Sequence, residues 1–197
     1  MSDLDLLLAG VGGQGTLLAS TIIAEVGIRA GYDVKKSEVH GMAQRGGAVS
    51  SHVRWGQRVF SPLIGAGQVD ILIALEQLEA LRYTQMLHRN SRVLVSDCVI
   101  MPVSVTCGDA RYPTRAEIVD RLQRIAPAVS IVPGMAIADR LGNPRVNNVV
   151  VLGALSMWTA PGADVWEQVI CDCVPAKYRQ LNLEAFAEGR RFVESAP

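Results

Sequence analysis

The sequence has little lysine and no net charge, and both features limit the partners it can bind. Its 19 basic residues balance 19 acidic ones, and the only lysines are Lys35, Lys36 and Lys177. A protein that binds nucleic acid or an anionic membrane usually carries a basic surplus on one face. We therefore expect neither nucleic acid nor a membrane among the partners.

Paired cysteines and long apolar runs are also missing. The cysteines, Cys98, Cys107, Cys171 and Cys173, form no C-x-x-C pair, so no zinc knuckle or iron–sulfur ligand set is expected. We expect all four to be reduced and buried as small apolar side chains. The apolar stretch 147–158 is shorter than a membrane span, and the first ten residues carry acids where an export signal needs bases. A cytoplasmic location is predicted.

What remains is the composition of an ordinary globular chain. With 197 residues, 49% of them hydrophobic, the sequence can build one domain with a substantial core. Short apolar runs alternate with segments of helical periodicity, which predicts an α/β fold with a mainly parallel, Rossmann-like sheet. We assign residues 1–197 to a single domain. The strands are expected at 4–10, 32–39, 47–56, 69–76, 91–97 and 129–134, and the main helices at 16–31, 77–88, 113–122, 135–144, 147–158 and 181–196.

A glycine-rich loop follows the first predicted strand. Gly10, Gly12 and Gly15 have the G-x-G-x-x-G spacing of dinucleotide-binding loops, which place a phosphate at a helix N-terminus. An acid near the end of the second strand would bind a ribose hydroxyl, and Asp33 or Glu38 could take that role. A mere tight turn would also favour glycines, so spacing alone leaves the ligand open. The predicted cofactor-binding residues are Gly10, Gly12, Gly13, Gln14, Gly15 and Thr16.

A second stretch is more distinctive. The segment "EVHGMAQRGG", residues 38–47, together with "GVGGQGT", "DILIALEQLEALR" and "LNLEAFAEG", resembles the gamma-type domain of 2-oxoacid:ferredoxin oxidoreductases. The likeness covers nearly the whole chain and is greatest to the indolepyruvate oxidoreductase beta subunits. In the segment 38–47, the glycine-flanked Arg45 can contact a carboxylate or phosphate with two hydrogen bonds. The residues predicted to contact substrate or partner are His40, Met42, Gln44, Arg45, Gly46 and Gly47.

The resemblance implies a two-subunit enzyme that oxidatively decarboxylates arylpyruvates, indolepyruvate above all, to the acyl-CoA while reducing ferredoxin. It places thiamine diphosphate, magnesium and the iron–sulfur clusters on a larger alpha subunit. Coenzyme A is a ligand that the two subunits would share. In the fused pyruvate-oxidising members of the family, the gamma-type domain is thought to help hold coenzyme A, and the helix after its glycine loop carries an Asn-Lys pair. This chain has Ser20 and Thr21 there, so a coenzyme A contact from that lysine does not carry over.

The sequence supplies no set of residues that could run such chemistry alone. We expect this chain to bind no cofactor tightly, to hold no metal and to be inactive in isolation. Two alternatives stay open: an independent NAD- or flavin-binding oxidoreductase, and a structural subunit of another 2-oxoacid oxidoreductase. Of the remaining histidines, His52 is expected in the core and His88 on the surface.

Overall fold

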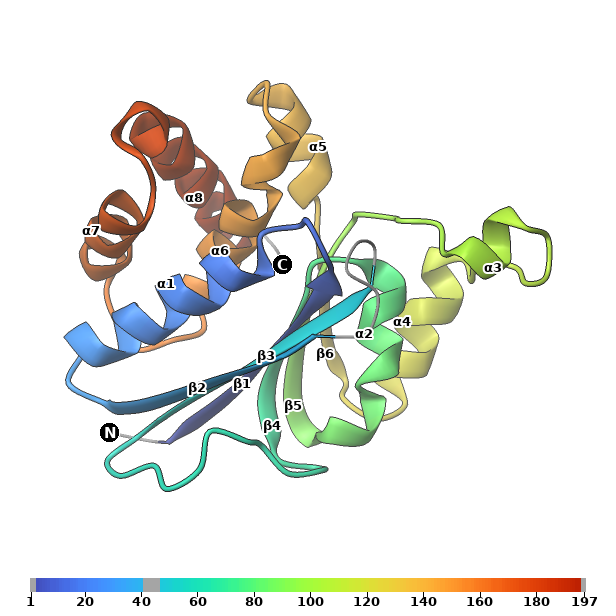
Figure 1. Ribbon diagram of the computed structural model, residues 1–197, viewed down its shortest axis with the longest axis horizontal. Coiled ribbons are helices and arrows are strands. Elements are labelled where there is room, and N and C mark those ends of the chain that lie inside the picture. Colours follow the sequence, from blue (N-terminus) through green and yellow to red (C-terminus); the bar gives the residue numbers. More distant parts are fainter. Residues whose placement is uncertain (1–2, 41–46, 196–197) are drawn as a thin grey trace.

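The fold is built on one six-stranded sheet, shown in Figure 1. The computed structural model describes residues 3–40 and 47–195. The strands lie in the order β2-β3-β1-β4-β5-β6. Their bounds are β1 Leu4–Val11, β2 Asp33–His40, β3 Ala48–Gly56, β4 Val69–Ala74, β5 Leu87–Ser96 and β6 Ala128–Val132.

Five of these strands run in one direction. β1, β4, β5 and β6 pair in parallel, whereas β3 is antiparallel to both β1 and β2. The predicted α/β class with a mainly parallel sheet is confirmed, and β3 is its one antiparallel strand. Because β3 lies between β1 and β2, the second strand of the first β-α-β unit is not the neighbour of the first.

Helices cover both faces of the sheet (Figure 1). α1, α5, α6, α7 and α8 lie on one face, and α2 and α4 lie on the other. The alternation of a strand's side chains produces two cores: in β1, Leu6 and Leu8 face the larger helical layer, and Leu7 and Ala9 face the smaller one. The helices are α1 Thr16–Arg29, α2 Gln77–Arg82, α3 Val103–Thr106, α4 Arg115–Gln123, α5 Gly134–Arg140, α6 Asn147–Ser156, α7 Ala163–Cys173 and α8 Arg179–Glu194.

Two local predictions are met closely. α4 begins with a capping box, in which the Thr114 hydroxyl accepts a hydrogen bond from the Glu117 N–H and the Glu117 carboxylate accepts one from the Thr114 N–H. α6 is buried on all sides, as its apolar sequence predicts. It packs closely against α8, where Gly153 and Gly189 let the two backbones approach: a Cβ at either glycine would collide with the opposite helix.

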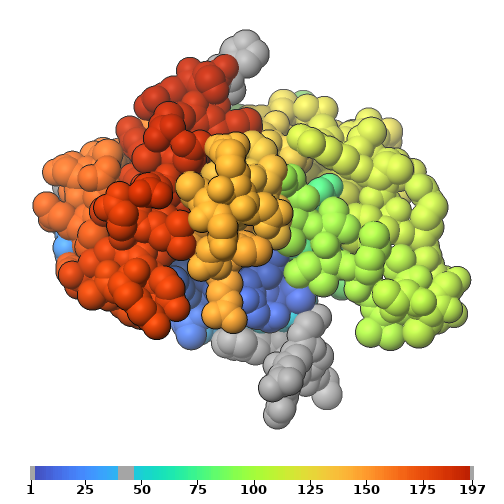
Figure 2. Space-filling view, turned by 90° about the horizontal axis from the view of Figure 1, so that it is seen from above, coloured from blue at the N-terminus to red at the C-terminus, as the bar shows by residue number. Residues whose placement is uncertain are grey.

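Two other predictions are corrected. The helix expected at 77–88 ends at Arg82, because Leu87 already pairs with Val69 as the start of β5. Of the four cysteines only Cys98 is buried. Cys107 follows the short helix α3 and is exposed. The two cysteines of α7 are half-buried. The segment that carries α3 stands out from the body of the molecule, as Figure 2 shows.

Candidate functional site

The glycine loop joins β1 to α1 in a conformation that requires glycine. Gly13 has φ 103° and Gly15 has φ 75°, both in the left-handed region that other residues rarely adopt. Gly15 is the N-cap of α1 and supplies no side-chain hydrogen bond, so the first N–H groups of this helix stay available to an anion. A Cβ at Gly13 would meet no atom of the described residues within 4 Å.

Gln14 points into the protein. Its Oε1 accepts a hydrogen bond from the Val11 N–H at 2.8 Å, and its Nε2 donates to the Leu75 carbonyl at 2.8 Å and to the Cys98 sulfur at 3.4 Å. Each of the atoms that a ligand would use is therefore already engaged. The structure gives Gln14 the task of fixing the loop against the ends of β4 and β5, and its predicted role in binding a cofactor stays a prediction.

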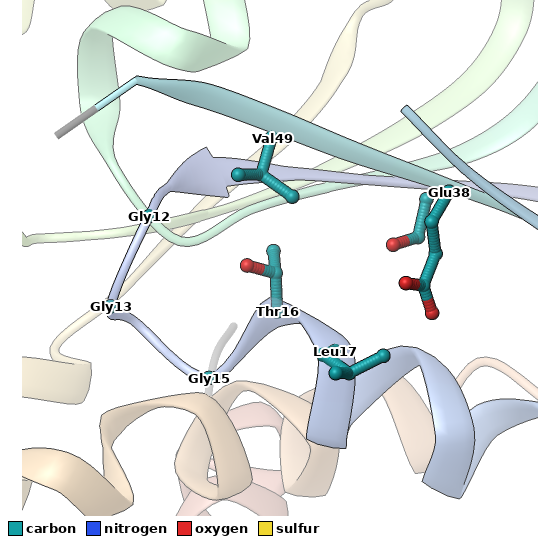
Figure 3. Close-up of a pocket in the computed structure, with 8 residues that line it drawn as sticks. Gly12, Gly13, Gly15, Thr16, Leu17, Glu38 and Val49 are labelled. Carbon is teal, nitrogen blue, oxygen red and sulfur yellow. The ribbon is translucent and has the colours of Figure 1, made fainter. Parts of the chain in front are cut away.

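A hollow of about 370 Å³ lies between the loop, the first turn of α1, and strands β2 and β3. Figure 3 shows Thr16 and Leu17 below it, and Val49 and Glu38 on the strands above. The remaining lining residues are Gly12, Gly13, Gly15 and Ser51. Thus four of the six predicted cofactor-binding residues line this hollow, whereas Gly10 and Gln14 lie behind it.

Four lining residues, Leu17, Glu38, Val49 and Ser51, lie outside the predicted set of cofactor-binding residues, although Glu38 was a candidate for a ribose hydroxyl. Ser51 is fully buried, and its hydroxyl has no hydrogen-bond partner among the described residues. Glu38 lies on β2 and forms an ion pair with Lys36 at 2.8 Å. The β-branched alternation of residues 47–56 predicts that Val49, Ser51 and Val53 share one face of a strand, but only the tertiary structure shows that this face meets the glycine loop.

The two acids proposed for a ribose hydroxyl separate clearly. Glu38 lines the hollow, which is the position expected of a residue that binds a ribose hydroxyl. Asp33 begins β2, at the end of the strand away from the glycine loop, where its carboxylate accepts hydrogen bonds from Lys35 Nζ at 2.5 Å and from the Val59 N–H at 2.8 Å. Those bonds lower the pKa of Asp33, with the Lys35 bond the larger cause. The structure therefore rules Asp33 out as a ligand at the glycine loop.

Most of the predicted contact segment lies outside the described residues. This applies to Met42, Gln44, Arg45 and Gly46, and the side chain of His40 is likewise not described. Gly47 is described: its carbonyl accepts a hydrogen bond from the Gly12 N–H at 2.9 Å. The end of the segment therefore touches the glycine loop, and the two distinctive motifs of the sequence meet at the carboxyl end of β1. The roles of the contact residues stay predictions.

A buried carboxylate organises the neighbouring strand end. Glu76, only 1% exposed, caps α2 by accepting a hydrogen bond from the Glu79 N–H and also accepts from the Ile100 N–H and the Tyr112 hydroxyl. Burial, and then the bond to Glu76, raise the pKa of Tyr112, so this phenol stays protonated. Glu76 therefore fixes both ends of the projecting segment around α3 to the sheet edge that carries the hollow.

Two more polar residues lie near the carboxyl end of β5: Asp97, which follows the strand, and Asn147, which begins α6. The Asp97 carboxylate accepts hydrogen bonds from the Met135 and Ala136 N–H groups at 2.7 and 3.4 Å, and Asn147 Oδ1 accepts from the Ser96 hydroxyl at 2.8 Å. The Asp97 carboxylate is thus paired with backbone N–H groups, and Asn147 is paired with Ser96. In the described ranges there is no group of three or more His, Cys, Asp or Glu side chains that could hold a metal ion.

The two other histidines lie where they were expected. His52 is 8% exposed, and its Nδ1 accepts a hydrogen bond from the Ile64 N–H at 3.2 Å. Burial lowers its pKa, so it is a neutral core residue. His88 is partly exposed and faces Asp70 at 3.7 Å. Neither lines the hollow.

An α/β sheet with a glycine-rich loop at the carboxyl end of its first strand defines a broad structural class, whose ligands bind at that edge. Within it, the chain belongs to the pyruvate ferredoxin/flavodoxin oxidoreductase family, which matches residues 5–192. No helix in the described part of the chain is both long and apolar enough to cross a membrane.

Individual relatives are similar over nearly their whole length. The indolepyruvate oxidoreductase subunit IorB of Archaeoglobus fulgidus is 44% identical over 188 residues, which are 94% of this chain and 93% of the relative. The subunit of the same name from Thermococcus kodakarensis is 36% identical, with 96% and 95% covered. Among solved structures, the gamma subunit of a keto/oxoacid ferredoxin oxidoreductase from Geobacter sulfurreducens superimposes with a TM-score of 0.72 at 26% identity, with 98% and 99% covered.

Proposed function

We propose that this chain is the small accessory subunit of a thiamine-dependent 2-oxoacid:ferredoxin oxidoreductase that acts on indolepyruvate and related arylpyruvates. The observation that carries the proposal is the 44% identity to an indolepyruvate oxidoreductase subunit across 93% of that subunit. A likeness of this extent concerns the whole folded unit, not a shared loop.

The chemistry is assigned to the complex. A larger subunit would hold thiamine diphosphate, magnesium and the iron–sulfur clusters, and would pass the electrons to ferredoxin. Within residues 3–40 and 47–195, no cluster of side chains suits a metal, and the buried Glu76 and the partly buried Asp97 are committed to capping and hydrogen bonds. This division supports an accessory role.

The part we assign to this chain is an anion site at the hollow. Within the described residues, the N-terminus of α1 has no side-chain cap, no atom lies within 4 Å of a Cβ at Gly13, and the Ser51 hydroxyl lacks a partner. These features fit a phosphate of coenzyme A, with a carboxylate of the large subunit as the second candidate. Coenzyme A accepts the acyl group in the overall reaction, and the residues of the hollow would bind and orient it.

The direct test is reconstitution. This chain is produced with and without its large subunit, and reduction of ferredoxin is measured with indolepyruvate, phenylpyruvate, pyruvate and 2-oxoglutarate in the presence of thiamine diphosphate, magnesium and coenzyme A. We expect turnover only by the complex, and fastest with an arylpyruvate. Turnover by the chain alone would contradict the accessory role. Preference for a non-aromatic 2-oxoacid would favour the second alternative, a subunit of another oxidoreductase, and tight binding of NAD or FMN by the lone chain would favour the first.

Blocking the hollow tests its part in the complex. Gly13→Val would add strain, because φ is 103° there, so Val49→Phe is the sharper variant: Val49 lies on a strand and points into the hollow (Figure 3). We expect the Michaelis constant for coenzyme A to rise at least severalfold while the complex still assembles. Val39→Phe, at an exposed position on β2, is the matched control and should leave that constant unchanged.

A further inference from the structure

An apolar surface stands out from the body of the molecule at the projecting segment, residues 98–112. Four of its side chains, Val99, Ile100, Met101 and Val103, are exposed, and among the described residues none of the four belongs to either core. Figure 1 shows α3 on this segment, away from the sheet. Apolar side chains that are exposed singly are ordinary, whereas several together on one segment indicate a contact with another molecule.

The projecting segment is held by its two ends. The Glu76 carboxylate accepts hydrogen bonds from the Ile100 N–H at 3.1 Å and from the Tyr112 hydroxyl. In between, residues 102–110 bond to one another through their backbones and include the one-turn helix α3. A helix of one turn is not stable by itself in water, and ordering these residues costs conformational entropy that burial of apolar side chains normally offsets. Contact with a partner would supply that burial.

The chemistry of the projecting segment restricts the kind of partner. Residues 98–108 contain no Asp, Glu, Lys, Arg or His, and Arg111, near the end of the segment, is already paired with Glu117 at 2.6 Å. A partner that is recognised by its charge would therefore find little to pair with here. Few charged residues and an enrichment in methionine are instead typical of the core of an interface between folded proteins. The segment fits an apolar, uncharged protein surface.

The base of the projecting segment is bonded to the glycine loop. Gln14 Nε2 donates to the Leu75 carbonyl at 2.8 Å and to the Cys98 sulfur at 3.4 Å. Leu75 directly precedes Glu76, and Cys98 is the first residue of the segment. The segment therefore leaves the sheet at the same carboxyl edge as the hollow, and Figure 1 shows both at the upper side of the sheet. A subunit that brings cofactors to the hollow must cover this edge, where it meets the segment.

We propose that the projecting segment is a docking arm for the large, cofactor-bearing subunit, with Met101 and Val103 as its apolar contacts. The occupant is an apolar, uncharged face of that subunit. This inference rests on the proposed function for the existence of the subunit, and it adds the surface that binds it. A second copy of this chain would also bury the apolar side chains, but it would bring no cofactor to the edge that carries the hollow.

The first experiment measures the dissociation constant between this chain and the purified large subunit by calorimetric titration. Val103→Asp and Met101→Asp should each weaken binding about tenfold or more, because each places an unpaired charge in an apolar contact. Val103→Leu keeps the contact apolar and should bind within about threefold of the wild type. Because Met101 and Val103 are 52% and 76% exposed, the melting temperature of the lone chain should stay the same in all three variants.

Phe60→Asp is the matched control. Phe60 is 83% exposed, so the substitution also replaces a large exposed apolar side chain by a charge. It lies on the loop between β3 and β4, which leaves β3 at the amino end of β1, where Trp55 pairs with Leu4. The projecting segment leaves from the opposite end of the sheet. Phe60→Asp should therefore change the affinity for the large subunit by no more than about twofold.

Hydrogen exchange followed by mass spectrometry tests the same surface without any substitution. In the wild-type complex, the amides of residues 99–106 should exchange more slowly than in the lone chain, because the partner covers them. The amides of residues 57–67, on the loop that carries Phe60, should exchange at the same rate in both. Sedimentation of the lone chain with and without Val103→Asp shows whether a second copy binds instead.

Three results would overturn the inference: wild-type affinity of the double variant Met101→Asp with Val103→Asp, an equal loss of affinity in Phe60→Asp and Val103→Asp, and unchanged exchange of residues 99–106 on assembly. A lone chain that forms a dimer, which Val103→Asp dissociates without affecting the large subunit's binding, would also overturn it and assign the surface to a second copy.

The proposed function is judged separately by ferredoxin reduction. A complex that turns over arylpyruvates, and in which the double variant binds as tightly as the wild type, would keep the function and reject the inference. A large subunit that protects residues 99–106 and loses affinity in the variants, but reduces no ferredoxin with any 2-oxoacid, would keep the docking surface and reject the function. A wild-type chain that binds no thiamine-containing subunit would reject both.

Discussion

Replacement of Gln14 by alanine separates a structural role from a ligand-binding one. Gln14 lies in the middle of the glycine loop, yet its side chain bonds to Val11, Leu75 and Cys98. Val11 is 7% exposed and Leu75 is fully buried. Alanine would leave the N–H of the first and the carbonyl of the second without their side-chain partner.

The expected cost follows from these two backbone groups. A buried donor or acceptor that loses its partner costs about 1–3 kcal/mol, and the bond to the Cys98 sulfur is too weak to add much. Water entering from the hollow offsets part of this loss. We therefore expect Gln14→Ala to lower the free energy of unfolding by about 2–4 kcal/mol. The amides of the loop and of Val11 should also exchange their hydrogens faster than in the wild type.

Urea unfolding followed by circular dichroism measures the global effect, and hydrogen exchange by mass spectrometry measures the local one. Gln168→Ala is the control, because Gln168 is exposed on α7, and it should change stability by less than about 0.5 kcal/mol. If Gln14→Ala costs no more than this control while coenzyme A binding falls sharply, the structural assignment is wrong and Gln14 contacts the ligand.

Two further predictions concern the loop and the core. Gly15→Ala should lower the free energy of unfolding more than Gly108→Ala. Both glycines have positive φ, but only a Cβ at Gly15 would collide with Asn148, at 2.5 Å from Nδ2. The difference between the two free energies of unfolding isolates the collision, and equal losses would refute it. Burial lowers the pKa of His52 below 6.5, so the unfolded chain binds a proton at higher pH than the folded one and stability falls as the pH drops below about 6.5. His52→Asn keeps an acceptor for Ile64 and should show a smaller loss of stability between about pH 7.5 and 5.5, and an unchanged loss would mean that other groups cause it.

The local features of this protein were determined by the sequence itself. A strand, a glycine loop and a helix in immediate succession specify the turn between β1 and α1, because each depends on residues a few positions apart. The capping box of Thr114 and Glu117 is equally local. The resemblance to 2-oxoacid:ferredoxin oxidoreductases also rests on short motifs, and the match to the family confirms that resemblance.

Only the tertiary structure decided which side chains meet. The helix predicted at 77–88 is cut short because Leu87 pairs with a strand about 18 residues earlier. Asp33 and Glu38 lie on one strand, but the direction of that strand places only Glu38 at the glycine loop. The insertion of β3 between β1 and β2 brings Ser51 to the wall of the hollow. Such contacts depend on the order and direction of strands, which the periodicity of any one segment does not contain.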